Sequence, residues 1–103
     1  MPEPALPRPF SMHWGDGQII EEARFESEHT VPAIQLLRFD SGPAEGSLTL
    51  RFCHFNHRGM FQRSPLMLSE DDIDRLRDAV AKTPEIQRLL QRIAGPPARG
   101  RAR

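Results

Sequence analysis

The sequence predicts an α+β domain: a curved antiparallel sheet of four or five strands, then a C-terminal helix, kinked or broken, packed on one face. Two observations lead to this prediction. Short apolar segments separated by turn-forming Gly, Pro, Asp and Asn residues follow one another over residues 10–68, as in consecutive strands. Residues 69–94 instead repeat their apolar side chains at helical spacing. Strands followed by helices are typical of the α+β class.

The length and composition indicate one small folded domain. The chain has 103 residues, and its 27% charged and 38% hydrophobic residues are typical of a soluble globular protein. The Pro-rich residues 1–9 and the basic residues 95–103 are expected to be flexible tails, which leaves residues 10–94 as the domain. A core of this size favours association with a partner chain.

The expected location is the cytoplasm. Cys53 is the only cysteine, so no intramolecular disulfide can form, and nothing in the sequence indicates an oxidising compartment. The sequence contains neither a signal-peptide core nor an apolar run of membrane-spanning length. A cytosolic protein without a membrane partner is therefore expected.

The clearest predicted strand defines two faces of the sheet. The expected strands span residues 10–14, 18–27, 33–39, 47–56 and 60–68, and residues 15–17 form a turn. In the fourth strand, the face with Leu48, Leu50 and Phe52 is expected to be the core. The opposite face, with Arg51 and Phe55, is expected to be open, because a helix covers only one face of a single sheet.

Two capping signals define the helical segment. Ser69 is a strong N-cap, and the acidic residues 70–72 that follow it complement the helix dipole. Thr83 and Pro84 form a second cap, which either kinks one helix or begins another. An apolar stripe follows at Ile86, Leu89, Leu90 and Ile93.

The segment from residue 47 to 69 contains no acidic residue, although the whole chain has zero net charge. It combines basic and aromatic side chains, which suit phosphates and unstacked bases respectively. The candidate nucleic-acid contacts are Arg51, Phe55, Arg58, Phe61 and Arg63. They predict a non-enzymatic module that binds single-stranded DNA or RNA, although the basic overall charge of many such proteins is missing.

Metal binding and catalysis have little support in the sequence. Cys53 and His54 are adjacent in a strand, so their side chains point to opposite faces, and no second Cys/His pair lies at ligand spacing. No phosphate-binding glycine loop, nucleophile elbow or metalloprotease helix is present. We therefore expect no metal, no cofactor and no enzymatic activity.

Residues 48–90 resemble the transcriptional coactivators of the positive-cofactor-four type and, more distantly, the Whirly proteins. The similar parts are the strand Leu48–Phe52, the glycine turn at Gly59, the basic segment through Arg63 and the strand that ends at the Ser69 helix cap. The resemblance implies a four-stranded curved sheet with a C-terminal helix, a homodimer, and single-stranded DNA bound along the sheet.

Two other function classes remain open. A protein-interaction or dimerisation domain could use the exposed sheet face, with Phe55, Phe61 and Met67 as contacts. A small-ligand or enzymatic role would place a deep pocket beside His54 or His57.

Overall fold

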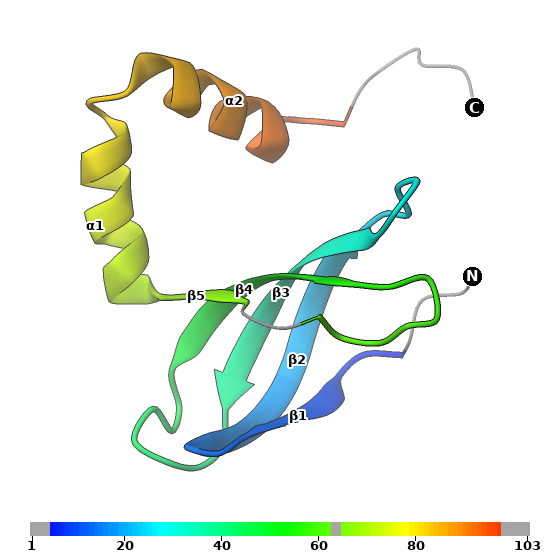
Figure 1. Cartoon of the computed structure of the whole chain (residues 1–103). Helices are drawn as coiled ribbons and strands as arrows, with labels where there is room; N and C mark the ends of the chain where they lie inside the picture. The colour runs from blue at the N-terminus through cyan, green and yellow to red at the C-terminus, as the bar shows by residue number, and fades with distance from the viewer. Residues whose placement is uncertain (1–4, 63–64, 98–103) are drawn as a thin grey trace. The chain divides into compact units, whose positions relative to one another are not determined.

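A computed structural model describes residues 5–62 and 65–97, and its contacts divide the chain into two compact units, up to Asp72 and from Ile73 onward. The first unit contains one five-stranded antiparallel sheet with strand order β1-β2-β3-β4-β5 (Figure 1). The strands are β1 Arg8–Met12, β2 Gly15–Arg24, β3 Val31–Phe39, β4 Leu48–Phe55 and β5 Leu66–Ser69. Each strand pairs with its neighbours in the sequence, so the sheet is a meander, and the predicted antiparallel sheet is confirmed.

Two helices follow the sheet, α1 Glu70–Val80 and α2 Pro84–Ala94. The α+β class is therefore confirmed, and Pro84 begins a second helix rather than kinking a single one. Packing of the helical segment on one face of the sheet stays a prediction. The N-cap predicted at Ser69 is confirmed, because its Oγ accepts a 3.2 Å hydrogen bond from the Asp72 amide. In return, the Asp72 carboxylate accepts one from the Ser69 amide at 3.2 Å, which completes a capping box.

The strand boundaries differ from the predicted ones at both edges of the sheet. Strand β1 begins at Arg8, inside the segment expected to be a tail, and β2 begins at Gly15, inside the expected turn. Strand β5 has only four residues, Leu66–Ser69. Phe61, which was expected to lie within this strand, forms an isolated bridge with Phe55 instead. Residues 63 and 64 of the same predicted strand lie outside the described residues.

Strand β3 separates a buried inner face of the sheet from a half-buried outer face. Every second β3 residue is buried, and this set defines the inner face: Val31, Ala33, Gln35, Leu37 and Phe39. Two apolar clusters lie on this face. One contains Phe10, Ile19, Leu37 and Phe39, and the other contains Val31, Ala33 and Phe55.

The sheet curves around this inner face. Strands β1 and β4 have two strands between them, so they would lie about 14 Å apart in a flat sheet. Nevertheless, the Arg51 guanidinium on β4 lies 5.8 Å from the centre of the Phe10 ring on β1. Met67 on β5 also packs against the cluster that contains Phe10. Side chains from β1, β4 and β5 therefore meet on the concave side.

The expected assignment of the two faces was wrong. Thr49, Arg51 and Phe55, expected on an open face, are buried with 7%, 8% and 9% exposure. Leu50 and Phe52, the expected core residues, are only half-buried. The physical reason is the pairing with β3. Residues 49, 51, 53 and 55 lie opposite the buried residues of β3, whereas Leu50 and Phe52 lie opposite its half-buried ones.

Candidate functional site

The five predicted nucleic-acid contacts lie in different environments. Arg51 and Phe55 are buried on the inner face, whereas Phe61 is 42% exposed. Arg58 is exposed in the turn after β4, where its amide donates a 2.9 Å hydrogen bond to the Asn56 side chain. Arg63 lies outside the described residues. The structure therefore brings three of the five together, Arg51, Phe55 and Phe61.

These three residues already use much of their stacking capacity on each other. The Phe55 and Phe61 rings meet edge to face with their centres 5.6 Å apart. The Arg51 guanidinium lies 4.7 Å from the centre of Phe61, and that of Arg24 lies 4.9 Å from the centre of Phe55. The result is a row of two rings and two guanidiniums, in which Phe61 is the exposed member. An open platform with both rings free to stack on bases is not present.

A polar network lies between the two apolar clusters of the inner face. Glu22 is its centre, because its carboxylate accepts two hydrogen bonds from Arg8, at 3.0 and 2.9 Å, and one from Arg24 at 3.2 Å. Gln35 donates to the same carboxylate at 2.7 Å. Its own carbonyl oxygen accepts a 2.7 Å hydrogen bond from Nε of Arg51. Strands β1 to β4 are therefore joined by one continuous chain of hydrogen bonds.

Burial and hydrogen bonding shift the pKa of two members of the network, Glu22 and Arg51, and of the adjacent Cys53. Burial by itself would raise the pKa of Glu22, but the hydrogen bonds from Arg8 and Gln35 outweigh it and lower that pKa below 4.5. Burial lowers the pKa of the Arg51 guanidinium. Burial also raises the pKa of the Cys53 thiol above 9.0, against the smaller opposing effect of the Arg51 charge. Cys53 is therefore a protonated thiol at neutral pH and lacks the low pKa of a reactive nucleophile.

The outer face carries a second candidate surface, which is apolar. Two rows of side chains cross β3, β4 and β5 in register, Leu36–Leu50–Leu68 and Ile34–Phe52–Leu66. We call these six residues the outer patch. Five of them are half-buried, and Leu66 is 55% exposed. The patch is therefore an apolar surface that the described sheet leaves incompletely covered.

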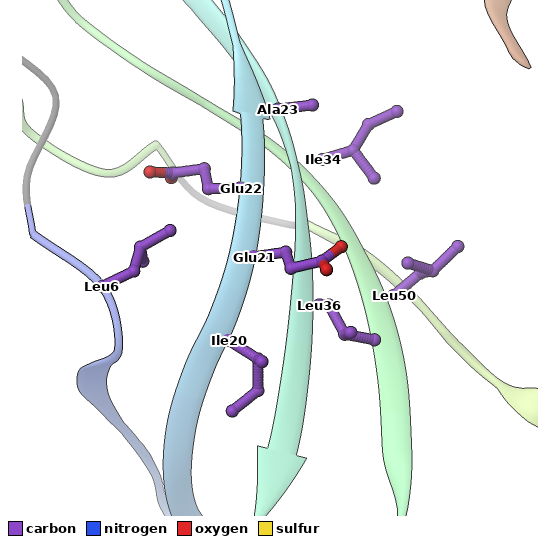
Figure 2. A pocket seen from close by; sticks show the side chains of 8 residues that line it. All are labelled: Leu6, Ile20, Glu21, Glu22, Ala23, Ile34, Leu36 and Leu50. Atoms are coloured by element: carbon purple, nitrogen blue, oxygen red, sulfur yellow. The ribbon is translucent and has the colours of Figure 1, made fainter.

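A shallow pocket of about 440 Å³ adjoins the outer patch on the β2 side. Figure 2 shows Ile34, Leu36 and Leu50 pointing to the same side of the sheet as Glu21, whereas Glu22 points to the other side. Adjacent side chains of a strand diverge in this way, so Glu22 serves the inner network while Glu21 borders the outer patch. The pocket is open and shallow, and neither His54 nor His57 lines it.

The histidines and the cysteine do not gather into a metal site. Cys53 packs with the inner cluster, whereas His54 is exposed and pairs with Pro32, so the predicted divergence of these two side chains is confirmed. Within residues 5–62 and 65–97, no group of three or more His, Cys, Asp or Glu side chains could hold a metal ion. Neither of the described helices has the length and apolar content needed to cross a bilayer.

Sequence reasoning missed the members of the inner network other than Arg51. Arg8 was assigned to a flexible tail, and Glu22, Arg24 and Gln35 were treated as ordinary strand residues. Gln35 could have been identified from the sequence. It occupies a position where the alternation of β3 places apolar residues, and a polar residue buried at such a position requires a polar partner.

Comparisons with protein-family models, with curated proteins and with solved structures give no match to this chain. The candidate sites are therefore interpreted from their own geometry.

Proposed function

We propose that this chain is a non-enzymatic protein-interaction module that forms a homodimer through the outer patch. The observation that carries the proposal is the pair of in-register apolar rows, in which none of the six side chains is buried. Contiguous exposed apolar surface of this kind is typical of an interaction site. The two rows lie on a regular sheet face, which can pack against another sheet with interdigitating side chains.

A second copy of this chain fits the surface on grounds of charge. Two charged residues border the outer patch. Glu21 on β2 lies opposite Leu36, and Arg38 lies two residues after Leu36 on β3. A two-fold interface is self-complementary, so a border with one charge of each sign can face its own copy without repulsion. The zero net charge of the chain likewise imposes no long-range repulsion between copies.

The energetics predict a weak dimer. Fully burying a large apolar side chain contributes about 1.5–3 kcal/mol, and half-buried side chains have already gained part of this. With about 1 kcal/mol left for each patch residue, the two copies together would gain on the order of 10 kcal/mol. The cost of association is about 4–15 kcal/mol, so the two quantities are similar. The dimer is therefore expected to dissociate on dilution.

Sedimentation velocity over a concentration series tests this proposal. We expect a reversible shift from the 11.7 kDa chain mass towards twice that mass as the concentration rises. A single species at the chain mass up to millimolar concentration would contradict the proposal.

Single-stranded nucleic-acid binding is the second candidate function. It is supported by the exposed side chains after β4, among which Arg58 offers a cation and Phe61 an accessible ring. Fluorescence anisotropy of a labelled single strand of ~20 nucleotides, at low and moderate salt, tests this candidate. Saturable binding that weakens with salt and is lost in Arg58→Glu would support it, and no binding at low salt would rule it out.

A further inference from the structure

The inner network holds more positive than negative charge. Three guanidiniums, those of Arg8, Arg24 and Arg51, surround Glu22, which is the one carboxylate that the described residues place in contact with the group. Two positive charges are therefore left uncompensated within the described part of the chain. The side chains of Arg24 and Glu22 are only 8% and 1% exposed, so water screens this excess poorly.

The same guanidiniums retain hydrogen-bond donors. Each guanidinium has five N–H groups. Among the described residues, Arg24 donates one hydrogen bond to Glu22, and Arg51 donates one to Gln35. No buried polar side-chain atom of the described residues lacks a partner, so the remaining donors are at least partly accessible. The Arg51 guanidinium lies over the Phe61 ring, which is 42% exposed at the edge of the network, and the Arg24 guanidinium lies over the Phe55 ring.

We propose that Arg8, Arg24 and Arg51 form a binding site for a phosphate group on the inner face of the sheet. A phosphate group matches both features of the cluster, because it carries up to two negative charges and accepts hydrogen bonds from planar guanidiniums in a bidentate geometry. Glu22 holds Arg8 and Arg24 in place and, together with Gln35, sets the position of Arg51. This site is on the face opposite to the outer patch and is independent of the proposed dimer.

Two kinds of ligand carry a phosphate group of this chemistry, the free phosphate ion and the phosphodiester of a nucleic-acid strand. Two-dimensional NMR of the arginine Nε–Hε groups can separate them. The wild-type protein is titrated with inorganic phosphate and, separately, with a single-stranded oligonucleotide, both at constant ionic strength. We expect saturable shifts of the Arg24 and Arg51 signals, whereas Arg38, on the outer face, should not move.

The variant Arg24→Gln is expected to raise the dissociation constant obtained from the titration at least tenfold. Arg38→Gln, a matched change of an exposed arginine, should leave that dissociation constant unchanged. Shifts with inorganic phosphate support the site, and shifts with the oligonucleotide alone support it and assign a phosphodiester as the source. Absence of saturable shifts with both in the folded wild-type protein overturns the proposal, whether or not the variants fold.

Discussion

Nε of Arg51 donates a 2.7 Å hydrogen bond to the side-chain carbonyl oxygen of Gln35, its direct partner across the β3–β4 ladder. Gln35 has no measurable exposure, and Arg51 is 8% exposed. The side-chain amide of Gln35 in turn donates a hydrogen bond to Glu22, so one neutral residue links a buried cation to a buried anion. The Gln35 side chain therefore uses both its carbonyl oxygen and its amide within the network, and it links Arg51 to Glu22.

Replacement of Gln35 by a leucine of similar size is predicted to destabilise the fold. Gln35→Leu leaves Nε of Arg51 without its acceptor and removes one donor from Glu22. A buried polar group that loses its partner costs about 1–3 kcal/mol, and more when it is charged. Urea unfolding measures the change in the free energy of unfolding. The control Gln87→Leu, on the exposed surface of α2, should stay within about 0.5 kcal/mol of wild type. Equal effects of the two changes would contradict this account of the network.

Glu22 predicts an acid-sensitive contribution to stability. Its pKa in the folded chain lies below the ordinary 4.5, so the unfolded chain binds a proton more readily than the folded one. The contribution is therefore fully present above about pH 4.5 and is lost as the pH falls through the folded pKa. Urea midpoints measured from about pH 7 down to about pH 3 should fall more steeply for wild type than for Glu22→Gln. Parallel pH profiles of the two proteins would show that Glu22 is not the group responsible.

Cys53 is predicted to be slow to alkylate. Burial raises the pKa of its thiol above 9.0, so little thiolate is present at neutral pH, and its packing against the inner cluster limits access. Mass spectrometry after timed exposure to iodoacetamide should show much slower labelling of the folded chain than of the same chain in urea. Similar rates in the two states would mean that the inner face around Cys53 is open.

Two glycines in the turn between β3 and β4 provide a matched pair for testing that turn. Gly42 and Gly46 both adopt positive φ, +85° and +83°. A side chain at Gly42 would collide with the backbone carbonyl of Trp14, whereas one at Gly46 would meet nothing within 4 Å. Gly46→Ala should therefore cost only the backbone strain, about 1–2 kcal/mol. Gly42→Ala should cost more and lower the thermal unfolding midpoint further. Equal losses would mean that the turn does not pack against Trp14.

The order of the elements could be predicted from the sequence because turn residues and helix caps are local signals. Ser69 illustrates this, since the N-cap needs only the hydroxyl and the first amides of α1.

The inner and outer faces could not be assigned correctly because the choice depends on pairing between strands. Alternation in β4 separates Leu50 from Arg51 but does not show which face the neighbouring strand buries. Strand β2 adds a further difficulty, because an irregularity between Ile19 and Glu21 shifts its register. As a result Ile19 lies on the inner face and Ala23 on the outer face, although a regular strand would place two residues four positions apart on one face.

The homodimer is tested most directly by two matched substitutions measured by sedimentation velocity. Leu66→Glu places a charge in the outer patch, and Met60→Glu places the same charge in the turn after β4. The two side chains are similarly exposed, at 55% and 59%, so neither change should unfold the single chain. We predict that Leu66→Glu remains at the single-chain mass at concentrations where wild type and Met60→Glu form dimers. Dimers of Leu66→Glu that are as stable as those of Met60→Glu would contradict the assignment of the outer patch as the interface.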